Sequence, residues 1–176
     1  MELEEREFVM AYLGLGSNMG NREANLREAL RLFDKKVIVE QVSSFYETEP
    51  IECLGQPKFL NIACRAITTL DPWELLASLK RIEVILGRIA SPRNFPRPID
   101  VDILFYGDEV INSPRLVIPH PRLEDRAFVL VPLAELAPDL VHPVNGRTVK
   151  ELLQTVKGLE GVLKWRSANR RSKEAE

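Results

Sequence analysis

The chain has 176 residues, of which 45% are hydrophobic and 28% charged, a composition typical of one folded domain rather than a fibrous, disordered or membrane protein. Its 24 Lys and Arg residues nearly balance its 26 Asp and Glu residues, so bulk charge does not favour nucleic acid as a partner and any anion site must be local. Cys53 and Cys64 match no metal-ligand spacing, and the charged N-terminus has neither a signal peptide nor a membrane-spanning run, so we expect reduced thiols and a cytoplasmic protein.

Hydrophobic periodicity predicts the elements of the first half of the chain. Three segments have the pattern of strands, and one repeats apolar residues at helical spacing. Gly14, Gly16 and Gly20 are interpreted as parts of a tight turn after the first strand, because such turns need glycine torsions. The expected elements are a strand over Phe8 to Leu15, a helix over Asn21 to Asp34, a strand over Val37 to Tyr46, a loop long enough to hold a ligand over Thr48 to Gln56, and a strand over Phe59 to Thr69.

The next helix has a clear start signal. Asp71 is a capping residue and Pro72 suits the first helical position, and apolar residues then continue at helical spacing to Gly87. The segment from Arg88 to Pro98 holds three prolines and three arginines without a period, which indicates an exposed loop. The remaining expected elements are strands over Ile99 to Tyr106 and Glu109 to Ile118, and helices over Leu123 to Leu136 and Val149 to Val156.

This order of elements predicts the fold class. Strand, helix, two strands, helix and strand form the βαββαβ core of an α+β, ferredoxin-like fold, an antiparallel sheet with helices on one face. The later segments are extra C-terminal elements. We expect a single domain over residues 1–163 and a basic tail over residues 164–176, which we interpret as frayed rather than as a nucleic-acid-binding arm.

A pair of aspartates in the last core strand is the most informative chemical feature. Ile99, Val101, Ile103 and Phe105 alternate and are expected to line one face of this strand, which places Asp100 and Asp102 on the other. Positions two apart along a strand are separated by ~7 Å, and carboxylates held in parallel at that spacing can share two divalent cations ~3.5 to 4 Å apart. An isolated pair would better be read as a solvated sheet face, but its cationic surroundings favour a metal site.

Cationic residues flank the aspartates on both sides in the sequence. Guanidinium groups around a carboxylate-bound metal are what a polyphosphate site requires. Arg97 lies between two prolines, which confine its backbone and aim its side chain. The imidazole of His120 either donates to a phosphate or caps a turn, and the residue type alone favours neither; His142 is interpreted as structural. The flanking cations are Arg88, Arg93 and Arg97 before the strand, and Arg115, His120, Arg122 and Arg126 after it.

Two further pairs have spacings suited to a site. Lys80 and Glu83 share a helix face near the basic loop, although an ordinary surface ion pair explains them equally well. Phe59 and Asn61 share a strand face, with a ring for stacking and an amide for the edge of a heterocycle. As core packing Phe59 is unremarkable.

Several short runs together resemble the 6-hydroxymethyl-7,8-dihydropterin pyrophosphokinase family, from about Ala11 to Leu153. No single run would suffice, but their order and spacing are specific. The runs are Leu15-Gly16-Ser17-Asn18, Ser43-Ser44-Phe45-Tyr46-Glu47-Thr48, Phe59-Leu60-Asn61, Arg81-Ile82-Glu83, Gly87-Arg88, Pro96-Arg97-Pro98-Ile99-Asp100-Val101-Asp102-Ile103-Leu104 and Ile118-Pro119-His120-Pro121-Arg122.

The resemblance implies a ferredoxin-like fold and an Mg²⁺-dependent transfer of pyrophosphate from ATP to a hydroxymethyl pterin, with release of AMP, in folate biosynthesis. It implies that Asp100 and Asp102 hold two Mg²⁺ ions and act in catalysis with Arg88 and Arg97. The implied ATP contacts are Lys80, Glu83, Arg88, Arg97, Ile103, Arg115, His120 and Arg126, and the implied pterin contacts are Thr48, Ile51, Phe59, Asn61 and Phe128. The implied partners are the two substrates and other folate-pathway enzymes, without nucleic acid or membrane.

The chain departs from the family pattern in two loops. Ala90 and Ser91 follow Arg88 where the family often has a second arginine, and Asn94 and Phe95 stand where it has a tryptophan. Arg93, Asn94 and Phe95 are the candidates to replace them. Glu49 stands where an apolar residue or proline is common.

Two other functions use the same residues. A two-metal phosphohydrolase or nuclease would use the acid pair with water as the acceptor. A ferredoxin-like ligand-binding module without catalysis would not need the arginines to converge. Formation of AMP that depends on the pterin separates all three.

Overall fold

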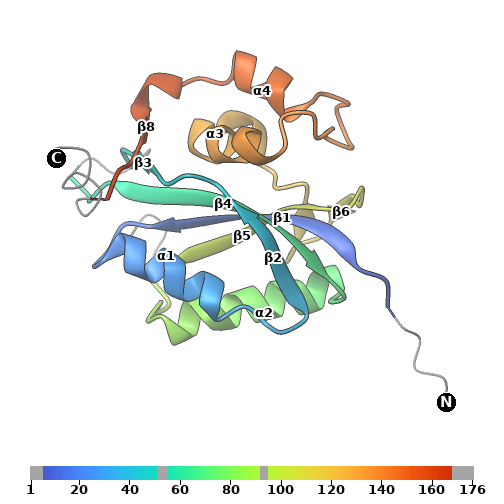
Figure 1. Ribbon diagram of the computed structural model, residues 1–176, viewed down its shortest axis with the longest axis horizontal. Helices are drawn as coiled ribbons and strands as arrows, with labels where there is room; N and C mark the ends of the chain where they lie inside the picture. Colours follow the sequence, from blue (N-terminus) through green and yellow to red (C-terminus); the bar gives the residue numbers. More distant parts are fainter. Residues whose placement is uncertain (1–5, 51–54, 92–94, 168–176) are drawn as a thin grey trace, which may run out of the picture.

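The computed structural model describes residues 6–50, 55–91 and 95–167, which form a six-stranded antiparallel sheet enclosed by helices (Figure 1). The strands run in the order β5-β1-β4-β3-β8, and β2 pairs with β4 as well. The strands are β1 (Val9–Ser17), β2 (Val37–Val42), β3 (Tyr46–Thr48), β4 (Phe59–Thr68), β5 (Asp100–Tyr106) and β8 (Val162–Lys164).

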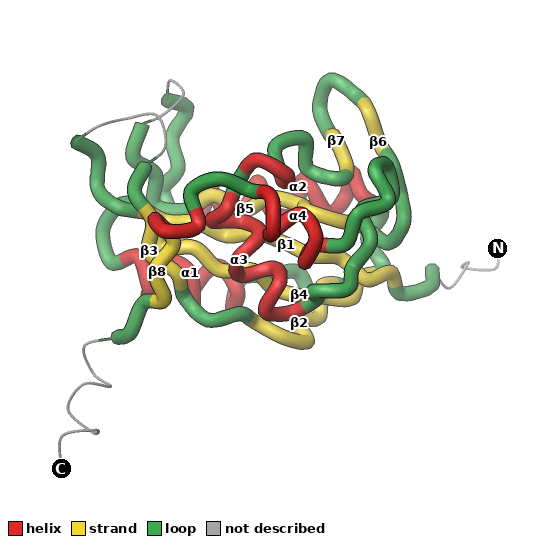
Figure 2. Tube along the Cα trace, turned by 90° about the horizontal axis from the view of Figure 1, so that it is seen from above, coloured by secondary structure: helices red, strands yellow, loops and turns green. Residues whose placement is uncertain are grey.

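The predicted ferredoxin-like core is confirmed, and the C-terminal elements add a second layer. The helices α1 (Arg22–Arg31) and α2 (Pro72–Ile85) pack on one face of the sheet, as the βαββαβ order predicts. The helices α3 (Ala127–Leu136) and α4 (Val149–Thr155) cover the other face (Figures 1 and 2). The prediction that helices cover one face of the sheet is therefore correct for the core alone. The whole sheet lies between two helical layers.

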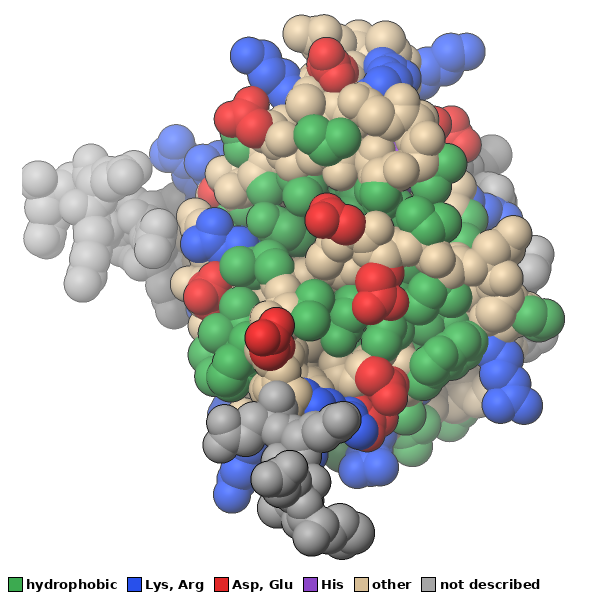
Figure 3. Space-filling model, turned by 90° about the vertical axis from the view of Figure 1, so that its right-hand side faces the viewer, with side chains coloured by type: hydrophobic (Ala, Val, Ile, Leu, Met, Phe, Trp, Pro, Cys, Tyr) green, Lys and Arg blue, Asp and Glu red, His purple; other side chains and the backbone are tan. Residues whose placement is uncertain are grey.

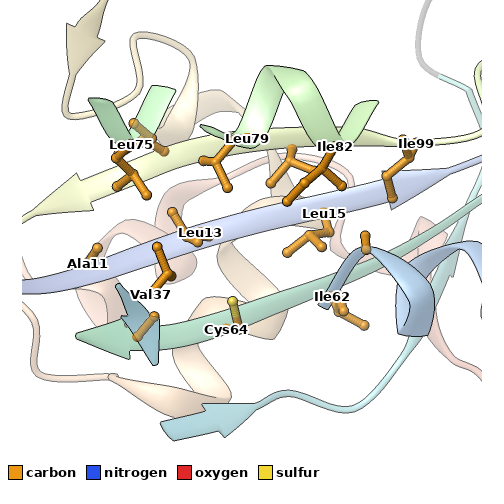
Figure 4. Packing of buried hydrophobic residues seen from close by; sticks show 14 of the residues in the cluster. Ala11, Leu13, Leu15, Val37, Ile62, Cys64, Leu75, Leu79, Ile82 and Ile99 are labelled. Atoms are coloured by element: carbon orange, nitrogen blue, oxygen red, sulfur yellow. The ribbon is translucent and has the colours of Figure 1, made fainter. Parts of the chain in front are cut away.

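The capping and apolar signals that predict α2 have their expected roles. Asp71 caps the helix, and Glu74 returns the contact in a reciprocal capping box. Leu75, Leu79 and Ile82 point from α2 toward the sheet and are almost fully buried (Figure 4). Burial of each such side chain stabilises the fold by about 1.5–3 kcal/mol.

The single strand predicted over Val37 to Tyr46 is in fact two strands, β2 and β3. Ser43 interrupts the ladder, because its backbone N–H donates to the carbonyl of Ala63 (2.9 Å) while its hydroxyl accepts the N–H of the same residue (2.9 Å). A side chain thus replaces a backbone partner, and the pairing with β4 resumes in a shifted register at Tyr46.

A bulge in β5 overturns part of the predicted alternation. The register with β1 passes from Leu13 opposite Ile103 to Tyr12 opposite Phe105, so Leu104 is an extra residue on β5. Val101 and Ile103 pack on the α2 side as predicted, but Phe105 turns to the α3 side and joins the second core cluster. The strict alternation therefore fails at Phe105.

The later segments contain shorter elements than predicted. The strand expected over Glu109 to Ile118 is a hairpin of β6 (Ile111–Asn112) and β7 (Val117–Ile118), closed by hydrogen bonds between Ser113 and Leu116. The helix expected over Leu123 to Leu136 is a 3₁₀ turn, η1 (Leu123–Asp125), followed by α3. A second 3₁₀ turn, η2 (Leu159–Gly161), leads into β8.

The sheet continues past the expected boundary at residue 163. Lys164 is the last residue of β8, opposite Tyr46 of β3. Trp165 follows, donating its backbone N–H to the carbonyl of Phe45 (2.8 Å) and packing its ring 6.0 Å from that of Phe45. The expected frayed tail therefore begins inside ordered structure, and residues 168–176 lie outside the described part. Among the described residues, no helix is long and apolar enough to cross a bilayer.

Candidate active site

A cavity of about 400 Å³ opens where β1 ends, β4 and β5 begin and α3 lies above them. It is lined by residues far apart in the sequence that the patterns single out separately. Six of these are Phe59, Asn61, Arg97, Asp100, Asp102 and Phe128. The fold thus joins the predicted pterin contacts and the predicted metal carboxylates in one space.

Two glycines of β1 form the floor of the cavity, so the interpretation of all three glycines as turn residues is wrong for these two. Gly14 and Gly16 lie in β1 rather than in a turn, opposite Asp102 and Asp100 respectively. A Cβ atom on Gly16 would come within 2.8 Å of Asn61 Oδ1, and one on Gly14 within 3.3 Å of Leu104 Cδ2. These two glycines therefore provide space, and only Gly20, with φ of 69°, has the torsions expected of the turn.

Asp100 is surrounded by positive charge. Arg88 Nη1 lies 2.7 Å from its Oδ1, and Arg97 Nη1 lies 3.5 Å from its Oδ2. Burial by itself raises the pKa of this carboxyl, but the charges of Lys80, Arg88 and Arg97 outweigh burial, so the pKa of Asp100 lies below its usual value. Asp100 is therefore held ionised.

Asp102 has the opposite environment. Burial, together with the negative charge of Asp100, raises its pKa to about 6. Lys80 Nζ lies 3.9 Å from Asp102 Oδ1 and His120 Nε2 lies 4.0 Å from its Oδ2, both longer than a hydrogen bond. A half-buried carboxylate in this state would be stabilised by an added cation.

Lys80 and Glu83 hold the outer edge of β5 from α2. Glu83 Oε1 accepts the backbone N–H of Val101 (2.8 Å), and Lys80 Nζ donates to the carbonyl of the same residue (3.2 Å). The carboxylate of Glu83 is 4% exposed and also pairs with Lys80 (2.9 Å) and Arg88 (2.7 Å). The pair is thus not an ordinary surface ion pair, because it positions the backbone between the two aspartates.

His120 has a defined tautomer. Its Nδ1 accepts the N–H of Arg122 (3.2 Å), so in the neutral ring the proton is on Nε2, which faces Asp102. Burial, followed by the charge of Arg126, lowers the pKa of His120 to about 4. The two roles considered for His120 are compatible, because one nitrogen caps a turn and the other is a donor that faces Asp102.

The aromatic side of the cavity is built from β3, β4 and α3. Asn61 is 5% exposed, and its Nδ2 donates to Thr48 Oγ1 (2.9 Å). Phe128 lies on α3, where the guanidinium of Arg126 stands 5.5 Å from the centre of its ring. This region has two rings and an oriented amide.

Several predicted site residues lie elsewhere. Ile103 is 4% exposed and packs in the core on the α2 side, which leaves only its backbone to contact a ligand. Arg115 is exposed in the turn between β6 and β7 and does not line the cavity. Phe95 is 53% exposed.

The remaining residues of the two loops have separate outcomes. Glu49 lines the cavity and pairs with Lys58 (3.2 Å). Ile51, Arg93 and Asn94 lie outside the described residues.

The positive charge around the aspartates is local. Figure 3 shows the face at the other end of the sheet, where hydrophobic and acidic side chains dominate and Lys and Arg lie toward the rim. No group of three or more His, Cys, Asp or Glu side chains among the described residues is arranged to hold a metal. Two carboxylates without further protein ligands suit Mg²⁺, which is commonly held by one or two carboxylates and substrate phosphates.

Comparison with known families accounts for this arrangement. Residues 12–138 match the family described as 7,8-dihydro-6-hydroxymethylpterin-pyrophosphokinase (HPPK). The chain belongs to the HPPK family. The resemblance read from the short sequence runs is thereby confirmed.

Named HPPK relatives include free-standing enzymes and parts of larger proteins. The chain is 41% identical over 140 residues to a 2-amino-4-hydroxy-6-hydroxymethyldihydropteridine pyrophosphokinase of Aquifex aeolicus, and 42% identical over 159 residues to that of Bacillus subtilis. These alignments cover 80% and 89% of the chain, and 88% and 90% of the relatives. It is also 52% identical over 133 residues to a mitochondrial folate synthesis bifunctional protein of Arabidopsis thaliana; this match covers 75% of the chain but only 24% of that relative.

Solved structures show the same HPPK fold. A crystal structure of Plasmodium falciparum HPPK-DHPS matches with a TM-score of 0.71 at 20% identity, over 86% of the chain and 46% of that protein. A structure described as HPPK-DHPS in complex with substrates matches with a TM-score of 0.68 at 17% identity, over 85% and 43%.

The sequence patterns did not single out some residues that the HPPK fold brings to the cavity. Gln56 and Asp125 line it, but neither stands in a periodic or charged pattern that marks a site. Asn18 stands in one of the resembling runs, but no pattern marks it as a site residue, although it is 1% exposed and hydrogen-bonded to two loops. A signal for such residues arises only from long-range contacts.

Proposed function

We propose that the chain transfers pyrophosphate from ATP to the hydroxymethyl group of 6-hydroxymethyl-7,8-dihydropterin, giving AMP and the pterin diphosphate in folate synthesis. The carrying observation is the single cavity that contains both an aromatic region with an amide and a carboxylate pair with arginines. Family membership supports the same activity. The location in the cytoplasm and the association with another folate-pathway enzyme, both expected from the sequence, remain predictions.

The pterin is expected on the aromatic side. A flat heterocycle between Phe59 and Phe128 would stack on both rings. Because Asn61 Nδ2 is already bonded to Thr48, its Oδ1 is the atom that accepts a hydrogen bond from the pterin edge. Thr48 therefore acts by orienting the amide, and Ile51 remains an expected contact from the sequence.

The triphosphate is expected over β5. Arg88, Arg97 and Arg126 surround the carboxylates, and guanidinium groups bind phosphate oxygens in fork geometry. His120 adds an Nε2–H donor on the same side. Asp100 and Asp102 would hold two Mg²⁺ ions, which when bound neutralise charge on the phosphates.

The transfer is a direct displacement at the β-phosphorus. The pterin hydroxyl oxygen forms a bond to that phosphorus, the bond to the oxygen bridging the α- and β-phosphorus breaks, and AMP leaves with that oxygen. The hydroxyl proton passes to solvent. The chain contributes mainly by alignment and by fixed positive charge, as is usual in phosphoryl transfer.

One assay tests the proposal against both alternatives. The chain is supplied with ATP and Mg²⁺, with and without the hydroxymethyl dihydropterin, and AMP and free phosphate are measured. AMP that forms only with the pterin supports the transferase. Phosphate release without the pterin would indicate a hydrolase, and no turnover in either mixture would indicate a binding module.

A further inference from the structure

Asn18 joins the end of β1 to the arginine-rich loop by two hydrogen bonds to one residue. Its backbone N–H donates to the carbonyl of Arg97 (3.2 Å), and its side-chain Oδ1 accepts the N–H of Arg97 (2.8 Å). Pro96 and Pro98 flank Arg97 and have no N–H to donate. Both backbone polar groups of Arg97 are therefore held by Asn18, which orients the guanidinium toward Asp100.

The same side chain reaches the segment that precedes β4. Asn18 Nδ2 lies 3.3 Å from Gln56 Oε1 and 3.5 Å from the carbonyl of Pro57. The partners determine the orientation of the amide, because the N–H of Arg97 can only donate and the carbonyl of Pro57 can only accept. Gln56 and Arg97 both line the cavity, and Asn18 contacts both of them.

Asn18 is 1% exposed, so solvent does not replace a partner that is lost. An apolar side chain here would leave the part-buried N–H of Arg97 without its acceptor. The neighbouring Asn25, on α1, offers a contrast: its Nδ2 donates to the carbonyl of Met19 (2.9 Å) and to Ser17 Oγ (3.3 Å). These contacts join α1 to the end of β1 and the turn after it, and reach neither Arg97 nor Gln56.

We propose that Asn18 is a positioning residue that fixes Arg97 relative to Gln56 and Pro57, and thereby links the triphosphate side of the cavity to the pterin side. This rests on the proposed function, which assigns the two ligands to those sides. Asn18 itself need touch neither ligand. Its removal should reduce the effect that one bound ligand has on the affinity for the other, because the two sides then move independently.

The test measures this linkage directly. The dissociation constant of the pterin is measured by calorimetry without and with saturating Mg²⁺ and α,β-methylene-ATP, whose α–β bridge is not cleaved. The ratio of the two constants is the coupling factor. It is compared in the wild type, Asn18→Ala, Asn18→Asp and the control Asn25→Ala, together with kcat and the thermal midpoint.

In Asn18→Ala we expect the coupling factor to fall about 5-fold or more and kcat to fall about 10- to 100-fold. Asn18→Asp keeps the acceptor for Arg97 but replaces the donor to Gln56 and Pro57, so it should lose coupling while keeping most of its affinity for the ATP analogue. Asn25→Ala should lower the thermal midpoint and keep the wild-type coupling factor. If Asn18→Ala does not fold, Asn18→Asp decides.

Wild-type coupling in the Asn18 variants, with only a lower midpoint, would overturn the inference and leave the proposed function intact. A wild type that forms AMP but shows no coupling would do the same. A wild type that binds neither ligand and forms no AMP would overturn the proposed function, and the inference with it.

Discussion

Asp100 and Asp102 stand two positions apart on β5, yet their surroundings move their pKa values in opposite directions. Arg88 and Arg97 contact Asp100 and favour its ionised form. Burial and the negative charge of Asp100 disfavour the ionised form of Asp102 and raise its pKa. In the proposed metal site, a cation would stabilise the ionised form of Asp102 without breaking a close contact of that carboxylate. The two carboxylates should therefore respond differently to substitution.

Asp102→Asn should abolish Mg²⁺-dependent AMP formation and leave pterin affinity within about 3-fold of the wild type, since the aromatic side is untouched. Steady-state kinetics and pterin titration measure the two effects. Normal turnover in this variant would contradict the metal assignment.

Arg97→Ala should lower kcat by about 10²-fold, a typical loss when one charge-stabilising donor is removed, and change pterin affinity much less. The matched control is Arg31→Ala, which removes an exposed guanidinium that pairs with Glu28 on α1. A variant in which only pterin affinity changes would show that Arg97 does not act on the triphosphate.

At the scale of elements, β1 contributes to the site through two glycines, which have no side chain to fill the cavity. Gly14 and Gly16 leave the face of β1 open beneath the cavity. The side chains nearest to them, Leu104 and Asn61 respectively, differ in how easily they could move to accommodate an added methyl group. Asn61 is buried and held by Thr48, whereas the atom near Gly14 is the end of a leucine side chain. The missing methyl group at Gly16 thus leaves room for the side-chain amide of Asn61, the proposed pterin contact.

Gly16→Ala should raise the pterin dissociation constant about 10-fold, because the new Cβ would stand 2.8 Å from Asn61 Oδ1 and must displace it. Gly14→Ala, which meets Leu104 at 3.3 Å, is the matched comparison and should change that constant about 2-fold or less. Equal effects in the two variants would argue against the placement of the pterin at Asn61.

The C-terminal end of α3 is tied to β3 by one carboxylate. Glu135 accepts the N–H (2.9 Å) and hydroxyl (2.8 Å) of Ser44 and the hydroxyl of Tyr46 (2.6 Å). Burial raises the pKa of Glu135, but these hydrogen bonds outweigh it and the pKa is lowered overall. The bonds thus connect the layer that carries Phe128 to the strand that carries Thr48.

A lowered folded-state pKa means that the ionised form of Glu135 stabilises the fold above the unfolded pKa, near 4.5, and that this contribution disappears as the pH falls through the folded value. Glu135→Gln should be less stable than the wild type at pH 7, by about 1–2 kcal/mol, and the gap should narrow below pH 4.5. Urea unfolding at several pH values measures it. If the stability difference between the wild type and Glu135→Gln instead widened in acid, the ionised form of Glu135 would not be the stabilising one.

Across the whole molecule, β8 and Trp165 close the sheet beyond β3. Trp165→Ala should lower the free energy of unfolding by about 2 kcal/mol, through lost burial and the lost contact with Phe45. Trp73, which is 45% exposed on α2, is the control, and Trp73→Ala should cost less than half as much. Chemical denaturation compares them, and equal costs would mean that β8 is not part of the cooperative fold.

Local patterns predicted the element order, the α2 cap and the acid pair, because each depends on residues adjacent in the sequence. The features that were missed depend on pairing between distant segments. The Leu104 bulge, the interruption at Ser43 and the role of Gly16 become visible only when β5, β2 and β1 have a register. Phe128 and Arg97 meet in one cavity only because α3 covers the face that the core helices leave open.

The outer edge of β5 has a consequence for how copies of the chain meet. A strand at the border of a sheet ordinarily presents free backbone groups that can recruit a foreign strand. Here the N–H and carbonyl of Val101 are occupied by Glu83 and Lys80. Loss of either side chain would therefore reopen a template for intermolecular pairing beside Asp100 and Asp102, and self-association would be expected to accompany any loss of turnover.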